Sequence, residues 1–377
     1  TVSLPDTITD LGANTFYWCR ELQKVKLPEN LTKIGNSTFS YCGSLEELRI
    51  PDKVVQIDGD AFWNCSSLKK IYLPKNLKLI GSDAFYGCGS LKEITLPDGM
   101  ERIGFRAFGC CAALEEVVLP DSVKTIYNEE HGYVESYGIG TDIFYGCSSL
   151  KSVKLPKDLE VIKDSMFEGC TSLKSIELPS GITKIEEEAF KDCSSLSKIK
   201  LSGKVTEVGN NAFKDCTQLV SAYIPGSVQK IGENAFTGCS LLTIYGTENS
   251  YAQIYATEKG IPFSTGEMPD SEFTEEAAGE WTILTDGNNA IITSYTGTET
   301  VLTIPKILNG RKVIACKKDL LKDKADVITS VTIEAELTSL PDGFFSNFSQ
   351  LETVSLPDTI TDLGANTFYW CRELQKV

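Results

Sequence analysis

The sequence predicts a repeat solenoid of the α/β type, built from 23-residue rungs that each contribute short parallel strands. Two spacings carry this prediction. A Leu-Pro or Ile-Pro pair recurs every 23 residues, and a Phe with a Cys three positions later keeps the same interval. Examples are the pairs that begin at Ile50, Leu73 and Leu96, together with Phe62/Cys65 and Phe85/Cys88. A fixed period of this length is the signature of a solenoid.

Each rung is predicted from its local pattern. Alternation over 91–96 indicates a strand with Ile94 and Leu96 inward and with Glu93 and Thr95 outward. The following Pro ends the strand because it has no N–H to donate. A second extended segment at 77–80 ends at Gly81, where a turn with positive φ is expected. Residues 83–85 are predicted to form a helical turn, so the convex side is mostly irregular or short-helical.

The 13 Cys fall mainly in one column. Stacked strands lie about 4.8 Å apart, so these side chains are interpreted as a ladder of buried thiols. Disulfides between rungs remain an alternative that requires suitable Cβ directions. A metal site is not expected, because the chain has no Cys-x-x-Cys motif and one His. Cys110 lies one residue off the column and is expected to be exposed, and Cys316 lies outside the regular array.

Composition restricts the function. The formal net charge of −16 argues against nucleic acid and anionic membranes as partners. No run of 18 apolar residues occurs, so no membrane insertion is expected. With one His and no phosphate-binding or metalloprotease motif, the chain is predicted not to be an enzyme. No catalytic residue, cofactor or metal is expected.

The repeat resembles the BspA-like leucine-rich repeat family of bacterial surface proteins. The resemblance rests on the recurring Leu-Pro, Ile-Gly, Ala-Phe and Cys positions, and it covers most of the chain. It implies a right-handed leucine-rich-repeat-like solenoid. It also implies a cell-surface or secreted, extracellular protein that binds host matrix or other proteins, without catalytic residues. The sequence shows no cell-wall sorting motif, so the mode of anchoring is left open.

Four segments are predicted along the chain. Residues 1–242 form a ten-rung array lacking its N-terminal cap, and 243–263 form a helical C-terminal cap, with a helix between Ser250 and Gly260. Residues 264–279 are an acidic linker. Residues 280–377 form an N-terminal hairpin cap, turning at Asp286-Gly287, and the first rungs of a second or permuted unit.

Residues 353–377 are identical to residues 1–25, which gives a larger period of 352. Either the parent protein carries tandem domains, or one domain is present in permuted order. On the tandem-domain interpretation the terminal rungs are expected to have bare apolar faces. Head-to-tail or domain-swapped self-association is therefore a candidate interaction.

Three groups of residues are candidates for protein binding. The first is an aromatic run before the Cys column, and the second is the outward sheet face, which is mixed in charge and includes an aromatic ring. The third is a 13-residue insertion between Ile126 and Phe144. The candidates are Trp18, Tyr41, Trp63, Tyr86 and Tyr145 in the run, Tyr72 on the sheet, and His131, Tyr133 and Tyr137 in the insertion. The alternatives are simple ring packing along the wall and a tolerated surface insertion.

The resulting hypothesis is a non-catalytic solenoid that binds host or partner proteins. Two alternatives stay open at this stage. One is a structural or assembly role, as a surface layer or spacer. The other is a binding module attached to a larger enzyme.

Overall fold

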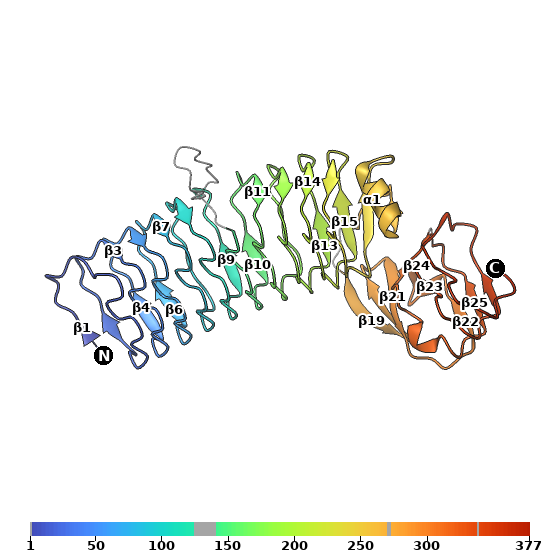
Figure 1. Ribbon diagram of the computed structural model, residues 1–377, viewed down its shortest axis with the longest axis horizontal. Helices are drawn as coiled ribbons and strands as arrows, with labels where there is room; N and C mark the ends of the chain where they lie inside the picture. The colour runs from blue at the N-terminus through green and yellow to red at the C-terminus, as the bar shows by residue number, and fades with distance from the viewer. Residues whose placement is uncertain (1, 124–140, 270–272, 338) are drawn as a thin grey trace. The chain divides into compact units, whose positions relative to one another are not determined.

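The structure is a computed structural model that describes residues 2–123, 141–269, 273–337 and 339–377. It divides into two compact units (Figure 1). Unit 1 comprises Thr1–Leu196, Lys200–Thr217 and Ser227–Gly238, and unit 2 comprises Ser197–Ile199, Gln218–Gly226 and Cys239–Val377. The boundary differs from the predicted segments, because the short segments Ser197–Ile199 and Gln218–Gly226 of the first array group with the C-terminal part of the chain.

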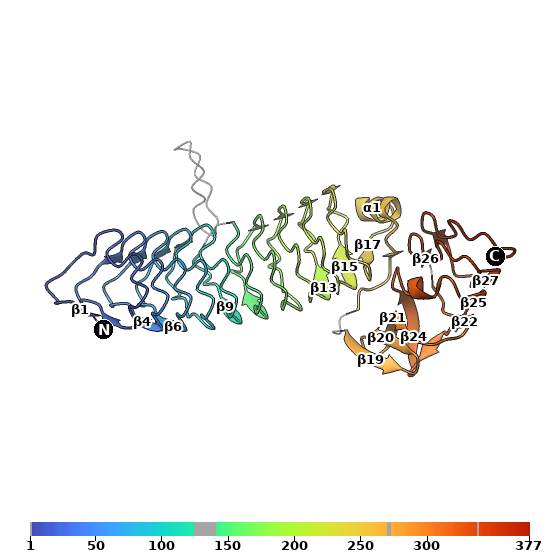
Figure 2. The same ribbon diagram turned by 60° about the horizontal axis from the view of Figure 1, so that its bottom comes forward.

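Unit 1 is a solenoid, which confirms the predicted fold class. Its rungs lie one after another as successive loops (Figure 2). The strands of one face pair in parallel as β1–β2, β4–β6 and β9–β10, with every partner 23 residues away except across the 36-residue step from β9 to β10. These strands are β1 (Val2–Ser3), β2 (Val25–Lys26), β4 (Glu47–Arg49), β6 (Lys70–Tyr72), β9 (Glu116–Val118) and β10 (Ser152–Lys154).

A second series of two-residue strands forms two four-stranded parallel sheets in unit 1. The first sheet holds β3 (Lys33–Ile34), β5 (Gln56–Ile57), β7 (Leu79–Ile80) and β8 (Arg102–Ile103). The second holds β11 (Val161–Ile162), β12 (Lys184–Ile185), β14 (Glu207–Val208) and β16 (Lys230–Ile231). The predicted alternation of burial is confirmed at 93–96, where Ile94 and Leu96 are buried and Glu93 and Thr95 are exposed, but the predicted strand is reduced there to a single bridge between Glu93 and Glu116.

The wall that joins these strands consists of turns, so the predicted helical turn at 83–85 is wrong. Alternate N–H groups donate to different partners. Asp83 and Phe85 donate forward to carbonyls of the next rung at 2.7 and 2.8 Å, whereas Tyr86 donates back to Asp83 O at 3.0 Å. A helix would direct all of these bonds within one rung. The alternation therefore gives each rung both a turn and a ladder to its neighbour.

The predicted role of Gly81 also requires correction. Gly81 does not have a positive φ. The nearby residues with left-handed backbone are Asp83 (φ 55°) and Gly87 (φ 73°). A Cβ on Gly81 would lie 2.5 Å from the backbone N of Gly59 in the preceding rung. Glycine is required here because two backbones approach closely.

Two ladders fill the core of unit 1. The Phe rings of neighbouring rungs stack nearly parallel, as between Phe62 and Phe85 at 5.1 Å. The Cys side chains form the second ladder, in which the thiols from Cys42 to Cys216 donate to a Phe carbonyl of the preceding rung, such as Cys88 to Phe62 O at 3.2 Å. Burial raises the pKa of the thiols of Cys65 and Cys88 and raises that of Cys42 to about 12. All 13 Cys are free, and the ladder thiols are buried except for the exposed Cys19 and the half-buried Cys371.

Unit 2 begins with the sheet β13–β15–β17–β18 and one helix. The strands are β13 (Lys198–Lys200), which straddles the unit boundary, β15 (Ser221–Ile224), β17 (Thr243–Gly246) and β18 (Phe263–Ser264). Helix α1 (Tyr251–Lys259) begins and ends as predicted. The Ser250 side chain accepts the N–H of Gln253, and Gly260 closes the helix at φ 62°. Both are ordinary helix caps.

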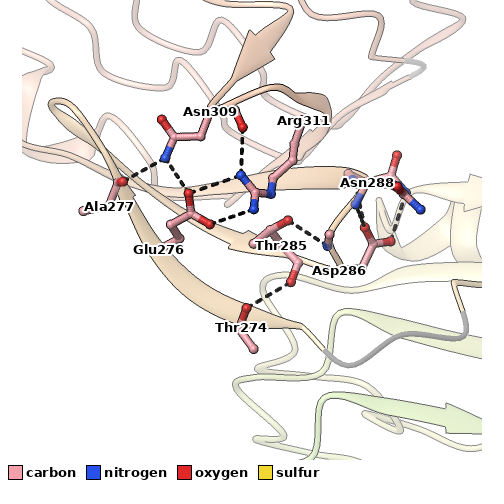
Figure 3. Close-up of polar contacts among 10 residues, drawn as sticks. Thr274, Glu276, Ala277, Thr285, Asp286, Asn288, Asn309 and Arg311 are labelled. Carbon is pink, nitrogen blue, oxygen red and sulfur yellow. Dashed lines mark hydrogen bonds and ion pairs between the residues drawn. The ribbon is translucent and has the colours of Figure 1, made fainter.

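A five-stranded sheet follows, in the order β19–β20–β21–β24–β23. It holds β19 (Thr274–Ala278), β20 (Trp281–Thr285), β21 (Asn289–Tyr295), β23 (Ile307–Leu308) and β24 (Arg311–Cys316). The predicted hairpin is confirmed: Asp286 Oδ1 accepts the N–H groups of Asn288 and Asn289 at the turn (Figure 3). Cys316 is buried in β24.

Part of the predicted linker is wrong, because residues 274–278 form β19 and pair antiparallel with β20. Figure 3 shows why this acidic segment is ordered: Glu276 and Arg311 form a two-pronged ion pair, with both N–O distances 3.2 Å. Asn309 donates to the same carboxylate at 2.6 Å. Paired guanidinium and carboxylate groups of this geometry are strong contacts.

The remaining residues of unit 2 form rungs of the same type. One parallel sheet contains β22 (Val301–Ile304), β25 (Ser330–Ile333) and β27 (Thr353–Ser355), and another contains β26 (Ser339–Leu340) and β28 (Asp362–Leu363). A short 3₁₀ helix spans Lys322–Lys324. Phe345 and Phe368 continue the ring stacking, at 5.6 Å. Their rungs share one apolar core with the five-stranded sheet.

Candidate protein-binding surface

The aromatic run occupies two columns of the turn wall rather than one. Trp18 and Tyr41 lie directly before the Cys column at left-handed positions, with φ of 65° and 63°. Trp63, Tyr86 and Tyr145 lie one residue earlier, at the position held by Tyr17 in the first rung. Left-handed backbone at bulky residues is uncommon. It is imposed here because the N–H of each residue donates to the next rung: Trp18 to Ser40 O at 2.8 Å and Tyr41 to Trp63 O at 2.7 Å.

Three rings form what we call the first aromatic cluster: Tyr17, Trp18 and Tyr41. The Trp18 ring lies 4.6 Å from Tyr41, and Tyr17 meets Tyr41 edge-on at 5.8 Å. Tyr17 and Trp18 are 46% and 47% exposed. The Arg20 guanidinium lies 4.1 Å from the centre of the Trp18 ring, a cation–π contact. The cluster thus presents a large apolar surface beside a cation.

The second aromatic cluster contains Trp63 and Tyr86, whose half-buried rings meet edge-on at 5.6 Å. The Arg106 guanidinium lies 5.1 Å from the centre of the Tyr86 ring and 4.5 Å from that of Phe105. A hydrogen bond with the Cys110 thiol is the main cause that raises the pKa of Tyr86 to about 12. Cys110 is therefore a half-buried partner of Tyr86, and the expectation of an exposed thiol is corrected.

Carboxylates hold Arg106 in place. Its Nε lies 2.9 Å from Asp83 Oδ1; the Asp83 side chain is largely buried and that of Arg106 is 33% exposed. Burial raises the pKa of Asp83, and the nearby positive charge of Arg106 opposes that shift. Burial also raises the pKa of Asp142, and the nearby positive charge of Arg106 opposes that shift. Arg106 thus lies between acidic groups of the two adjacent rungs, which fixes its orientation against the Tyr86 ring.

Tyr145 is half-buried and continues the column of Tyr86 in the next rung. The N–H of Cys110 donates to Tyr145 O at 2.6 Å, so the two rungs stay in register across the 13-residue insertion. The charge of Tyr145 contributes to the raised pKa of Tyr86. Tyr145 thus borders the second aromatic cluster.

Tyr72 lies elsewhere, in strand β6 on the sheet face. Its ring is 39% exposed, and Lys70 Nζ lies 5.0 Å from the ring centre. The ring borders a shallow groove of about 480 Å³ that is also lined by Arg49, Lys70 and Glu93. The structure therefore separates Tyr72 from the aromatic clusters of the turn wall. His131, Tyr133 and Tyr137 lie outside the described residues.

The later rungs of unit 1 have mainly charged side chains in the column of Tyr86, namely Glu168, Lys191 and Lys214. Lys191 replaces the aromatic ring and contacts Glu168 of the preceding rung at 2.9 Å and Glu188 of its own rung at 3.2 Å. We call these three residues the ion-pair cluster. Its backbone follows the same pattern, since Glu188 has φ 54° and Asp192 has φ 59°. Only the side chains distinguish the two halves of the wall.

Sequence reasoning missed Arg20, Arg106 and Cys110 as parts of the clusters. The signal at Arg106 was present, because it stands where neighbouring rungs have Asp83 and Asp142. Alignment of each column by its left-handed turn residue would have identified it.

In the described part of the chain, no three His, Cys, Asp or Glu side chains are arranged to hold a metal ion. Nor does any helix there combine the length and apolar character needed to cross a bilayer.

The rung geometry defines the class of the protein, a leucine-rich-repeat solenoid. A family model described as the BspA type leucine rich repeat region matches residues 1–103, 137–257 and 321–377. The chain belongs to this family, and the predicted resemblance is confirmed.

Solved structures of bacterial proteins match the chain along most of its length. A leucine-rich repeat protein from Bacteroides ovatus shows the same fold: it is 24% identical with a TM-score of 0.51, and the match covers 92% of this chain and 82% of that chain. A leucine rich cell surface protein from Faecalibacterium prausnitzii is 22% identical with a TM-score of 0.32, covering 92% and 76%. None of the curated proteins compared with the chain matches it.

Proposed function

We propose that this chain is a non-catalytic, protein-binding solenoid of a bacterial cell-surface or secreted protein, and that it contacts host or partner proteins. The observation that carries the proposal is the pair of aromatic clusters on one wall of unit 1. The proposed location of the protein outside the cell rests on its membership of the BspA-type family.

Three properties of the clusters support protein binding. Trp, Tyr and Arg are the residues most enriched among interface hot spots. Trp18 is about half exposed and has the Arg20 cation beside it, so a partner would bury both apolar and charged groups. The rings are also held in place before binding, which reduces the ordering cost of association. A rigid, partly exposed aromatic surface of this kind is typical of recognition sites.

The sheet face supports the same proposal in a lesser role. The groove at Tyr72 is lined by Arg49, Lys70 and Glu93, so charges of both signs lie beside one ring. A mixed surface fits a protein partner better than a polyanion. We assign it a secondary contact, because it lacks the stacked rings of the wall.

Binding to a panel of immobilised extracellular-matrix and surface proteins tests the proposal. The wild-type chain is expected to bind at least one member, and the W63S/Y86S double variant is expected to bind that member about tenfold or more weakly. Thermal unfolding and circular dichroism show whether the variant is folded. No binding across the panel, or equal binding by the folded variant, would contradict the proposal.

A further inference from the structure

A column of charged residues lies beside the second aromatic cluster. It takes one residue from each of four successive rungs, namely Asp60, Asp83, Arg106 and Asp142. All four have left-handed backbone, and the N–H of each donates to the next rung, as from Asp60 to Ser82 O at 2.9 Å. The column is therefore continuous across these interior rungs of unit 1.

This column has an excess of negative charge, because three carboxylates share one guanidinium. The ion pair of Arg106 is with Asp83, and these two groups neutralise each other. At Asp60 and Asp142 the guanidinium acts through its charge alone, and the pKa of both carboxyls stays raised, mainly by burial. A half-buried carboxylate is stabilised when a cation arrives beside it. Asp60 and Asp142 therefore favour a further cation on either side of Arg106.

Phe105 extends the aromatic surface beside the same column. Its side chain is 38% exposed. The equivalent positions of the adjacent rungs hold the small or polar residues Gly59, Ser82 and Thr141, so a rung packs without a ring there. Exposed aromatic side chains are enriched at protein interfaces. Phe105 is therefore a recognition residue that the packing of the wall does not require.

Tyr86 supports this surface from within the chain. A Cβ on Gly109 would lie 2.8 Å from Cδ2 of the Tyr86 ring, so the ring lies against the backbone of the next rung. The Arg106 guanidinium lies beside the same ring. Because its own chain holds the Tyr86 ring in this way, Trp63 and Phe105 provide the rings for a partner.

The rings of unit 1 already hold cations that belong to the chain itself. The Arg20 guanidinium lies 4.1 Å from the centre of the Trp18 ring, and that of Arg106 lies 4.5 Å from the centre of the Phe105 ring. Such contacts arise because the face of an aromatic ring attracts positive charge. The rings and the carboxylates therefore favour the same chemical group, the side chain of Lys or Arg.

We propose that the surface formed by Asp60, Trp63, Phe105 and Asp142, which we call the acidic aromatic patch, binds Lys or Arg side chains on a basic segment of the partner protein. This inference rests on the proposed function and adds the chemistry of the partner. The carboxylates pair with the cations, and the rings contact their aliphatic stems and charged ends. The formal net charge of −16 on the whole chain also attracts a basic segment from a distance.

Titration of the full chain with a fluorescently labelled Lys- and Arg-rich peptide, followed by anisotropy, tests the carboxylates. Wild type should bind the peptide, and D60N/D142N should bind it about tenfold more weakly. Asn tolerates left-handed backbone, so this variant should fold. The matched control D192N/D215N removes the same charges at two left-handed positions of the late rungs, both with φ 59°, and should change the affinity less than about twofold.

Phe105→Ser tests the contribution of the ring, because it removes an exposed aromatic group without changing the charge. It should weaken binding of the peptide about threefold. Circular dichroism and thermal unfolding show whether each variant is folded. The proposal would be overturned if wild type did not bind the peptide, or if it bound a Glu-substituted peptide equally well. Equal binding by wild type and D60N/D142N, an equal loss in the control, or no loss in Phe105→Ser would also overturn it.

Competition separates this proposal from the proposed function. The cationic peptide should displace a panel protein from wild type. A panel protein that needs Trp63 and Tyr86 but is not displaced would overturn the partner chemistry and leave the proposed function intact. Absence of binding across the panel would contradict the proposed function, whereas the peptide titration would still decide whether the patch binds cations.

Discussion

The early and late rungs of unit 1 share one backbone and one core but present different walls. In the early rungs, the positions before the Cys column carry Trp18, Tyr41, Trp63 and Tyr86. In the late rungs, Lys191 occupies the corresponding position and contacts Glu168 and Glu188. The Phe ladder runs through both halves with the same stacking, at 5.1 Å for Phe62–Phe85 and 5.2 Å for Phe167–Phe190. The fold thus constrains the Phe and the Cys and leaves the residues between them free to specialise.

The largest effect is expected from substitutions in the Phe ladder, which test whether the early and late rungs of unit 1 share one core. Phe85→Ala should lower the free energy of unfolding by about 3–5 kcal/mol, because it leaves a cavity between two stacked rings. Phe190→Ala should have a similar cost, since both side chains are fully buried. Urea denaturation followed by circular dichroism measures both. A difference of more than about 2 kcal/mol between the variants would show that the halves are packed differently.

Arg106→Met tests how the second aromatic cluster is held. The substitution leaves the largely buried Asp83 carboxylate without its cation, so the free energy of unfolding should fall by about 1–3 kcal/mol. Removal of the cation also frees the Tyr86 ring, which tyrosine fluorescence or NMR line widths can detect. Arg49→Met, at an exposed residue, serves as the control. Equal stability of the two variants would contradict the role given to Arg106.

Lys191→Met tests the ion-pair cluster. Partly exposed ion pairs contribute little, so we expect a loss of about 0.5–1 kcal/mol at low salt. The loss should shrink as added salt screens the charges of wild type. Urea unfolding at two salt concentrations measures it. A salt-independent loss would mean that Lys191 stabilises the wall through packing of its aliphatic chain instead.

The smallest expected effect concerns Asp60, whose pKa is raised above its usual 3.8 mainly by burial and secondly by the charge of Asp83. A carboxyl with a raised folded pKa stabilises the protein at low pH, and that stability is lost as pH rises through the folded pKa. Asp60→Asn should therefore stabilise the chain at pH 7 by about 0.5 kcal/mol, allowing for solvent screening.

Asn is suited to the left-handed backbone at this position, since Asn211 and Asn234 occupy equivalent sites with φ of 53° and 56°. The gain should disappear below about pH 4, where Asp60 is protonated. Thermal unfolding at several pH values measures it. A gain that persists unchanged at low pH would assign the effect to backbone preference rather than to charge.

The repeat predicted the core because periodic burial leaves a direct mark on the sequence. Phe85, Cys88 and the alternation at 93–96 all recur every 23 residues, and the hairpin has a local turn signal at Asp286. The reason for Gly81 was not predictable from one rung, because the close approach is to the preceding rung. Strand β19 was missed because its acidic residues are ordered by Arg311, which lies 35 residues away from Glu276.

The candidate surface was predicted as a list of rings, but its organisation was not. The spacing to the next Cys places Trp18 and Trp63 in different columns. That Arg106 orders the Tyr86 ring depends instead on how side chains of adjacent rungs meet across left-handed turns. Column-by-column alignment recovers part of this information, and three-dimensional geometry supplies the rest.

The central claim is that the aromatic half of the wall, and not the ion-pair half, binds a protein partner. The direct measurement is the dissociation constant of one partner from the panel for wild type, W63S/Y86S and E168S/K191S. Our account predicts about a tenfold or greater loss for the aromatic variant and less than about a twofold change for the ion-pair variant. Equal losses in the two folded variants, or a loss confined to the ion-pair variant, would contradict it.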